Sequence, residues 1–302
     1  MKYLIAGGKG FIGQALSRSL LQDGHQVWVL TRAIASPSQP AGLKILTWDG
    51  VTSQGWLDAF NEMDAVVNLA GATIGQWPWN SRRKQEILTS RLHAGAAFVE
   101  AYRLSNHKPP VYLQASGIGY YGPRGAAPVT EKDSAGNDFI ADLAKKWEAS
   151  SADLDVLPGV RRVMLRTSLV LDAHQGILPQ MALPVKLYAG GPLGNGRQGV
   201  SWIHSQDEIS AIRFLLDRPD ALGAFNLAAP NPLSNADFMR ALAKKLGKPF
   251  WLPAPAFMLR LLLGEMSTLL LDGQFALPER LESLGFKFKF PTLPAGLDEI
   301  YG

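Results

Sequence analysis

The stretch Tyr3-Leu4-Ile5-Ala6-Gly7-Gly8-Lys9-Gly10-Phe11-Ile12-Gly13 decides the fold. Its first four residues form an apolar run as long as a short buried strand, and residues 15–21 have the apolar spacing of a helix. Three glycines, Gly7, Gly10 and Gly13, stand between these two segments at intervals of three. The stretch therefore predicts a strand, a glycine-rich turn and a helix.

Each of these glycines has its own role in such a turn. Gly7 permits a tight turn off the strand, Gly10 has no side chain to block a pyrophosphate, and Gly13 lets the helix pack closely on the strand. The N–H groups and the positive dipole end at the start of the helix attract phosphates. The sequence thus predicts a dinucleotide site. The alternative is an ordinary glycine turn.

The end of the second expected strand, residues 26–32, bears on which dinucleotide binds. An acidic side chain there would bind the 2′-hydroxyl of the adenosine ribose of NAD. Here the strand ends in Thr31-Arg32, without an acid, and an arginine can pair with the 2′-phosphate of NADP. Lys9 adds a second positive charge nearby. The pattern favours NADP over NAD, and the alternative is that Arg32 is a solvated strand end.

Apolar runs and helix-period segments alternate through the first half of the chain. Further strands are expected at residues 43–49, 65–71, 111–116 and 162–171, with helices from about 80 to 104 and from 137 to 152. This alternation is typical of an α/β fold with a doubly wound parallel sheet. We expect a dinucleotide-binding domain over residues 1–171, rejoined by 201–228, and a smaller mixed lobe over 172–200 and 229–302.

Composition excludes several classes of site. The 302 residues include no cysteine, which excludes disulfides and thiolate chemistry, and the five histidines show no metal-ligand spacing, so no metal is expected. The net charge of +4 is spread too thinly for nucleic-acid binding. Charges interrupt the apolar segment 257–271, so no membrane span is expected. The first expected strand begins almost directly after Met1 and leaves no room for a signal peptide, which suits a cytoplasmic protein.

Further motifs are spread over most of the chain. They lie at residues 7–13, 68–71, 90–92, 119–122, 146–148, 165–167, 190–196, 202–204, 225–227 and 277–280. With these motifs the chain resembles the extended, or atypical, short-chain dehydrogenases/reductases of the NAD-dependent epimerase/dehydratase superfamily. More narrowly, it resembles the bacterial "epimerase family protein" group, which has a distinct C-terminal domain. The resemblance implies a Rossmann sheet with a substrate lobe.

The resemblance also implies which residues contact the cofactor, along the C-terminal edge of the sheet. The glycine-rich turn would hold the pyrophosphate, the end of the second strand would meet the adenosine phosphate, and the third and fourth strands would reach the adenine and its ribose. Two residues of the following helix would face the same groove, although either can equally be part of a solvated helix face. These residues are Gly7, Gly10, Phe11, Ile12, Gly13, Thr31, Arg32, Asp49, Leu69, Ala70, Gly71, Glu86 and Arg91.

The catalytic signature of short-chain dehydrogenases is incomplete. These enzymes use a Ser, a Tyr and a Lys four residues after the Tyr, one helical turn away. None of the seven tyrosines has a lysine at that spacing. Ser116, at the end of the fifth expected strand, lies near the position of the family serine. We hypothesise that Ser116 and one of Tyr120 or Tyr121 line the nicotinamide pocket, although Tyr121 can equally be a packed residue at a glycine turn.

Two functions remain open at this point. The first is an NADP(H)-dependent oxidoreductase or epimerase-like enzyme that acts on a small hydroxy or carbonyl substrate. The second is a non-catalytic NADP(H)-binding sensor or interaction protein, which the missing Tyr-x-x-x-Lys keeps in view. A homodimer is plausible because many relatives in this superfamily dimerise.

Overall fold

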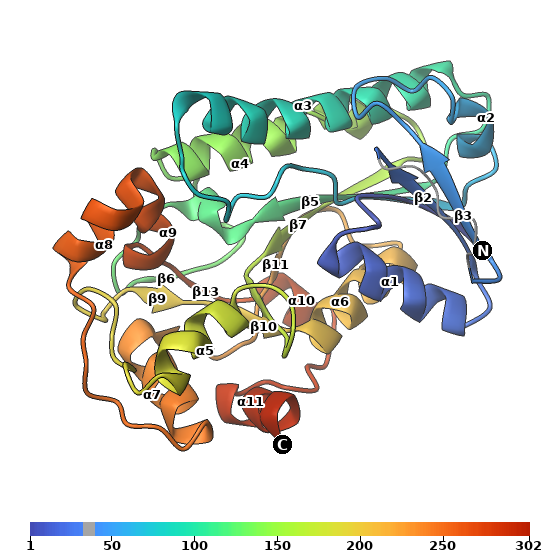
Figure 1. Ribbon diagram of the computed structural model, residues 1–302. Coiled ribbons are helices and arrows are strands. Elements are labelled where there is room, and N and C mark those ends of the chain that lie inside the picture. The colour runs from blue at the N-terminus through green and yellow to red at the C-terminus, as the bar shows by residue number, and fades with distance from the viewer. Residues whose placement is uncertain (33–39) are drawn as a thin grey trace.

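A seven-stranded parallel sheet forms the centre of the protein (Figure 1). The computed structural model describes residues 1–32 and 40–302. Residues 33–43 are rich in Pro, Ser, Ala and Gly, which predicts a surface loop, and most of them lie outside the described residues. The strand order is β3-β2-β1-β4-β5-β7-β11. The strands are β1 (Lys2–Ala6), β2 (Gln26–Thr31), β3 (Leu43–Thr47), β4 (Ala65–Asn68), β5 (Val111–Gly117), β7 (Arg161–Thr167) and β11 (Gly223–Leu227). The predicted doubly wound α/β fold is confirmed.

Helices cover both faces of this sheet. On one face lie α3 (Ser81–Leu104) and α4 (Phe139–Ala149), and on the other α1 (Phe11–Gln22) and α6 (Ser205–Asp217) (Figure 1). Successive residues of a strand point to opposite faces, so Leu4 packs in the cluster of Phe98 from α3 and Ile5 in the cluster of Leu16 from α1. This explains why the strands read as continuous apolar runs.

The strand order reverses between β1 and β4, the neighbours at the centre of the sheet. Ligands of doubly wound sheets bind beyond the carboxyl ends of the strands at such a reversal. The glycine-rich turn after β1 and the loop after β4 both lie there. The fold therefore places the predicted dinucleotide residues at the position where this architecture forms its sites.

The expected strand 162–171 is interrupted at Ser168. The Ser168 N–H and hydroxyl both reach the carbonyl oxygen of Leu227, at 3.0 and 2.8 Å, and the chain then leaves the sheet. Beyond it, β8 (Leu169–Leu171) pairs with β10 (Trp202–His204) in a separate two-stranded sheet. The last strand of the main sheet, β11, pairs with β7.

A smaller lobe has its own apolar core. Trp202, Leu178 and Phe238 meet there, and the contributing helices are α5 (Leu178–Lys186), α7 (Asn235–Lys245) and α11 (Leu293–Tyr301). The antiparallel pair β9 (Gly199–Val200) and β12 (Leu233–Ser234) belongs to it, and β13 (Phe275–Ala276) pairs with β6 (Pro128–Val129) beside the main sheet. The domain boundaries given above stay a prediction.

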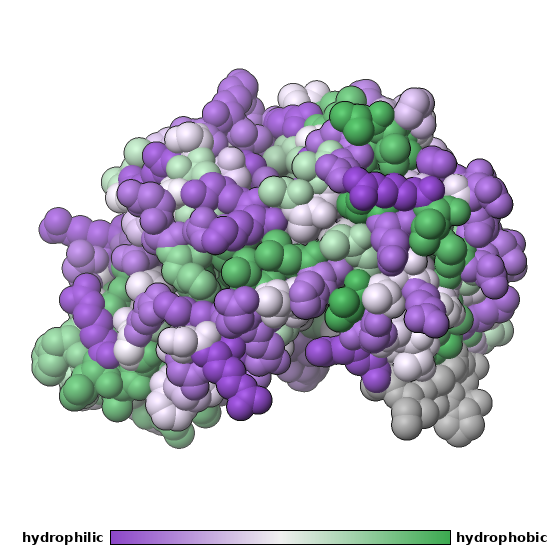
Figure 2. Space-filling view, turned by 90° about the horizontal axis from the view of Figure 1, so that it is seen from above, coloured by the Kyte–Doolittle hydropathy of each residue, from purple (hydrophilic) through white to green (hydrophobic). Residues whose placement is uncertain are grey.

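Short elements complete the chain. They are α2 (Leu57–Phe60), α8 (Ala256–Leu263), α9 (Thr268–Leu271), α10 (Glu279–Ser283) and the 3-10 turns Ile118–Tyr121, Ala152–Val156 and Gly264–Ser267. Apolar surface gathers at the left end of Figure 2, the end where Figure 1 places α8, and this helix exposes Phe257, Met258, Leu261 and Leu262. Within the described residues, no helix combines the length and apolarity needed to cross a membrane.

Candidate cofactor groove and its polar network

The glycine-rich turn is held by contacts that only glycine permits. Gly7 has a φ of +75°, and a Cβ there would lie 2.7 Å from the Leu69 carbonyl oxygen of the loop after β4. A Cβ on Gly13 would lie 2.5 Å from the Gly7 carbonyl oxygen. The Gly10 N–H donates to that same oxygen at 2.9 Å, and Gly10 is the residue before α1. Phe11 and Ile12 follow in the first turn of α1, where Ile12 packs against the core and neither residue lines the neighbouring pocket.

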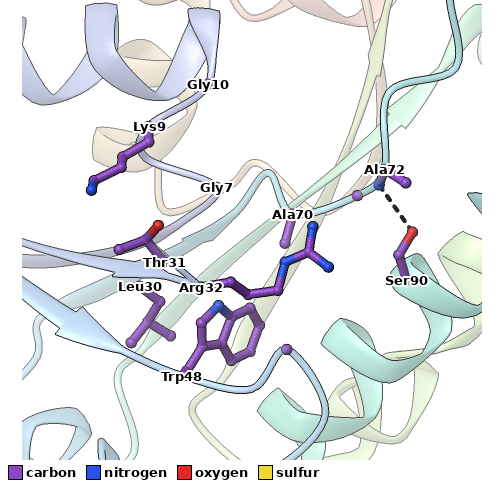
Figure 3. A pocket seen from close by; sticks show the side chains of 12 residues that line it. Gly7, Lys9, Gly10, Leu30, Thr31, Arg32, Trp48, Ala70, Ala72 and Ser90 are labelled. Carbon is purple, nitrogen blue, oxygen red and sulfur yellow. Dashed lines mark hydrogen bonds between the residues drawn. The ribbon is translucent and has the colours of Figure 1, made fainter. Parts of the chain in front are cut away.

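A pocket of about 310 Å³ lies beside this turn (Figure 3). Its walls come from the glycine-rich turn, the ends of β2 and β3, the loop after β4 and the first half of α3. The lining residues are Gly7, Lys9, Gly10, Leu30, Thr31, Arg32, Trp48, Gly50, Ala70, Gly71, Ala72 and Ser90. Seven of these were predicted from the sequence. The other five each lie next to a predicted position in the sequence, and Ser90 is the neighbour of Arg91 on α3.

The charged groups of the pocket wall have one sign. Lys9 and Arg32 line it, and no acidic side chain does so within the described residues. In Figure 3 the Arg32 side chain extends between Trp48 and Ala70, while Lys9 stands on the other side of Thr31. Trp48 is itself fixed by edge-on packing against Trp56, with ring centroids 6.0 Å apart. The pocket is therefore suited to an anionic ligand with a flat ring.

The carboxylates of Asp49 and Glu86 bind other groups of the protein, outside the pocket. Asp49 accepts the N–H groups of Val51 and Thr52 at 2.7 and 2.8 Å, and these hydrogen bonds hold its pKa below the ordinary value. Its neighbours in sequence, not Asp49 itself, line the pocket. Glu86 is exposed and pairs with Arg83 at 2.8 Å. Neither carboxylate is presented to the groove.

Arg91 lies underneath the loop after β4. Its guanidinium donates to the Ala72 carbonyl oxygen at 3.0 Å and to that of Ile87 at 2.9 Å, and the side chain is almost fully buried. The preceding residue, Ser90, accepts the Ala72 N–H at 2.9 Å. Two consecutive residues of α3 thus hold both backbone polar groups of Ala72.

A polar network lies where β5 and β7 end. The Ser116 hydroxyl donates to Glu148 Oε1 at 2.7 Å, and Glu148, on α4, forms a two-pronged ion pair with Arg166 at 2.8 and 2.9 Å. Burial opposes the charge of Arg166, but the hydrogen bonds and charge of Glu148 outweigh it and raise the pKa of the guanidinium. Neither Glu148 nor Arg166 was singled out from the sequence, although both lie inside motifs that carry the family resemblance.

The two candidate tyrosines differ in this network. Tyr121 is fully buried, its hydroxyl donates to Asn226 Oδ1 at 2.7 Å and accepts from Arg166 at 3.0 Å, and burial raises its pKa to about 12. The Tyr120 ring lies 3.5 Å from the Arg166 guanidinium carbon and is half-buried. The structure thus joins Ser116 to Tyr121 through Glu148 and Arg166, and leaves Tyr120 as the tyrosine with accessible surface.

The lysines of α4 point away from this network. Lys146 pairs with Asp142 of the same helix at 2.8 Å, and both side chains are about half exposed. Lys145 lies 3.9 Å from the same carboxylate and is likewise exposed. Neither lysine is paired with a tyrosine among the described contacts. The usual Tyr–Lys arrangement of short-chain dehydrogenases is thus absent from the described chain, as its sequence predicts.

Comparison with known proteins agrees with this geometry. Residues 3–228 match the model of the NAD dependent epimerase/dehydratase family. The chain belongs to that family. Residues 254–300 match a domain of unknown function, DUF1731, which accounts for the distinct C-terminal part of this family member. The predicted resemblance to extended short-chain dehydrogenases/reductases is confirmed.

Relatives of this family member match it end to end. An epimerase family protein from Staphylococcus haemolyticus is 37% identical over 300 residues, which cover 99% of this chain and 98% of the relative. The crystal structure of the human epimerase family protein SDR39U1 with NADPH is 31% identical, with a TM-score of 0.87 and coverage of 100% and 99%. A nucleoside-diphosphate sugar epimerase from Corynebacterium glutamicum is 27% identical, with a TM-score of 0.80, and the match covers 58% of its length.

Proposed function

We propose that this family member is an NADP(H)-dependent oxidoreductase or epimerase-like enzyme that acts on a small hydroxy or carbonyl compound. The observation that carries the proposal is the pocket wall, in which Lys9 and Arg32 are the charged residues and no acid takes part within the described chain. An acid at the end of β2 would mark NAD, whereas a cation there suits the additional phosphate of NADP. The human relative was crystallised with NADPH, which supports the same choice.

Residues of the groove would suit the pyrophosphate, the 2′-phosphate and the adenine of a dinucleotide. Gly10 carries no side chain toward the first turn of α1, where N–H groups suit a pyrophosphate. Arg32 would meet the 2′-phosphate, and Trp48 offers an apolar ring to the adenine. When bound, the cofactor would supply or accept a hydride at its nicotinamide ring.

The polar network would handle the substrate oxygen. The Ser116 hydroxyl donates a hydrogen bond to Glu148, so the lone pairs of its oxygen can accept a hydrogen bond from a substrate hydroxyl. Arg166 holds Glu148 in place with two hydrogen bonds. Tyr121 has no exposed surface, so we assign it to positioning Arg166, and Tyr120 is the tyrosine that could contact a substrate. We also propose that the protein is cytoplasmic and forms a homodimer.

A second function, a non-catalytic NADP(H) sensor, is favoured by one observation. Lys145 and Lys146, the lysines nearest to the family position, are exposed and engaged with Asp142. Without a lysine beside their hydroxyl groups, Tyr120 and Tyr121 lack the usual electrostatic help in proton transfer. Such a protein would bind NADPH without consuming it.

Arg32→Ala tests the cofactor assignment. The loss of a charge-assisted hydrogen bond costs about 1.5–3 kcal/mol, so the dissociation constant for NADPH should rise roughly tenfold or more, while that for NADH stays unchanged. Fluorescence titration of both cofactors measures this. Arg18→Ala, an exposed arginine on α1 outside the pocket, is the control for net charge. Equal losses for NADPH and NADH would show that Arg32 does not contact the 2′-phosphate.

The enzyme and sensor hypotheses are separated by turnover. Protein loaded with NADPH is mixed with a panel of aldehydes, ketones and sugar nucleotides, and cofactor absorbance is followed. Oxidation by one chemical class, lost in Ser116→Ala, supports the enzyme. Tight binding with no oxidation across the panel favours the sensor.

A further inference from the structure

Helix α8 is apolar around its whole circumference and yet has no buried residue. Seven of its eight residues are apolar, and the exception is Arg260. A helix of this kind is normally buried, either in a protein core or in a membrane. In the described chain, however, Phe257 is 69% exposed and Leu261 is 83% exposed. The composition of α8 therefore predicts a covering surface that the described residues do not supply.

The most exposed apolar side chains of α8 lie on one side of the helix. Phe257 and Leu261 are four residues apart, as are Met258 and Leu262, so they form two adjacent rows on a single face. The remaining apolar residues of the helix are partly buried and form the side turned toward the protein. Apolar surface gathers at this end of the molecule, at the left of Figure 2.

The apolar surface continues onto the segment before α8. Trp251 is 64% exposed, and Leu252 is also exposed. The N–H groups of both residues donate to the Gly190 carbonyl oxygen, at 2.8 and 3.0 Å, and the Ala254 carbonyl oxygen accepts the Gly194 N–H at 2.8 Å. One supported stretch of chain therefore carries a single apolar patch. The apolar patch consists of Trp251, Leu252, Phe257, Met258, Leu261 and Leu262.

The size of the apolar patch fits one half of a dimer interface. An aromatic side chain can bury about 150–250 Å². At the exposures of its six side chains, the patch offers on the order of 600 Å² of apolar surface. Two such patches placed face to face would bury roughly 1,200 Å², which is more than the ~1,000 Å² that a specific interface needs.

The charges around the patch favour a second copy of this chain over a lipid surface. Arg260 is the one charged residue of α8, and Glu265, which follows the helix, is already paired with Lys84 at 2.8 Å. A helix that binds a membrane surface combines its apolar face with several Lys or Arg residues, which attract anionic lipids. An apolar patch without such charges is self-complementary, and in a twofold dimer the same surface meets itself.

We propose that the apolar patch is the surface through which two copies of this chain associate. The inference rests on the homodimer included in the proposed function and names the surface that forms it. The four patch residues on α8 belong to the region 254–300, which matches DUF1731. The proposal therefore assigns to this region a role in self-association.

Leu261→Glu tests the proposed surface. Wild-type protein should sediment as a dimer in analytical ultracentrifugation over a range of concentrations. The variant places a charge in the apolar contact and should raise the dimer dissociation constant at least tenfold. Val156→Glu is the matched control, because Val156 is 81% exposed on the 3-10 turn Ala152–Val156, outside the patch. The control should leave the dissociation constant unchanged.

The absence of cysteine from the chain allows a second test. Leu261→Cys introduces a single thiol into the patch, and its reaction with a maleimide should slow as the protein concentration rises and dimers form. Val156→Cys should react at the same rate at every concentration. This measurement leaves the patch apolar, so it decides the question even if Leu261→Glu fails to fold.

Three results would overturn the inference, namely a monomeric wild type, a Leu261→Glu dimer as stable as the wild type, or equal behaviour of the two thiols. A monomer that floats with vesicles of phosphatidylglycerol, unless Leu261→Glu is introduced, would make a lipid surface the occupant and would equally refute it. NADPH titration of the same samples separates the two proposals. A dimer that depends on the patch but binds no NADPH refutes the cofactor assignment alone, and a monomer that binds NADPH refutes the interface alone.

Discussion

Two of the four buried arginines in the described chain, Arg166 and Arg91, have opposite environments. Arg166, at the end of β7, is bound in two places by Glu148 and also donates to Tyr121. Arg91, on α3, binds backbone carbonyl groups and has no acid partner in the described chain. Both are almost completely buried, at 5% and 7% exposure. The two arginines are therefore buried to the same extent, and they differ in whether an acidic side chain neutralises the guanidinium charge.

This difference indicates different roles. A cation paired inside the protein is fixed in one geometry and can orient its neighbours, as Arg166 orients Glu148 and, through it, Ser116. Arg91 is instead held by backbone carbonyl groups and stabilises the loop after β4 through them. The β5–β7 network is thus fixed by pairing between charged side chains, and the loop after β4 by contacts between a side chain and the backbone.

Glu148→Ala should produce the largest effect and would break the comparison by making Arg166 resemble Arg91. It leaves a buried guanidinium without its partner, which costs about 3–5 kcal/mol in the free energy of unfolding. Denaturant unfolding measures this loss. Glu86→Ala, which removes an exposed ion pair, should cost less than about 1 kcal/mol. A loss for Glu148→Ala as small as the control would mean that Arg166 needs no acid partner.

Glu208, on α6, is a buried acid without a paired cation in the described chain, and so it is the acidic counterpart of Arg91. Burial raises its pKa from an ordinary 4.5 to about 8, while one hydrogen bond from Thr167 at 2.9 Å opposes the rise. The folded protein keeps this proton to higher pH than the unfolded chain. The stabilisation that protonated Glu208 contributes to the folded protein is therefore complete below about pH 4.5 and is lost as pH rises through about 8.

Glu208→Gln should remove this loss. Wild-type stability should fall by up to about 1.4 kcal/mol per pH unit between those limits, and the variant should show a flatter profile. Urea unfolding from pH 5 to pH 9 measures both profiles. Parallel profiles would show that Glu208 is ionised in the folded protein.

Tyr121→Phe and Tyr120→Phe compare the two tyrosines that contact Arg166 in the polar network. Removal of the Tyr121 hydroxyl leaves Asn226 and Arg166 each one hydrogen bond short, at a cost of about 1–3 kcal/mol. The Tyr120 hydroxyl makes no hydrogen bond within the residues that the structure describes, so its loss should change stability by less than about 0.5 kcal/mol. Thermal or urea unfolding decides, and equal effects would contradict the roles assigned to the two tyrosines.

Gly71→Ala should have the smallest effect on stability and tests the loop after β4, beside Arg91. The new Cβ must displace the end of the Arg91 side chain, 3.0 Å away, so stability should fall by less than about 1 kcal/mol while NADPH affinity falls severalfold. Gly75→Ala, in the same loop with nothing within 4 Å of the new Cβ, is the control. Equal affinities for the two variants would mean that Gly71 does not border a bound ligand.

The sequence predicted the sheet and the glycine-rich turn well because their signals are local. The strand, the glycine-rich turn and the helix are contiguous, so Gly7, Gly10 and Gly13 could be assigned from spacing alone. Asp49 was the exception. It has the expected position, but an adjacent turn uses its carboxylate, and such a choice between backbone and ligand leaves no trace in the residue pattern.

The polar network could not be predicted in the same way. Ser116, Glu148 and Arg166 meet only after β5, α4 and β7 have packed, and no periodicity relates them. Tyr120 and Tyr121 are adjacent in a glycine-flanked turn, so the sequence could not tell which one becomes buried. The break of the expected sixth strand at Ser168 likewise depends on the distant Leu227 carbonyl group.

The path of the chain through the sheet limits how the molecule can open. The backbone leaves the main sheet after Thr167, returns to it with β11 at Gly223 and leaves it again after Leu227. Because the chain passes between the sheet and the smaller lobe more than once, we expect any movement of that lobe to be a small rotation about these connections. Exchange of a bound molecule should therefore need only a narrow swing. Cleavage of a single crossing should leave both halves associated.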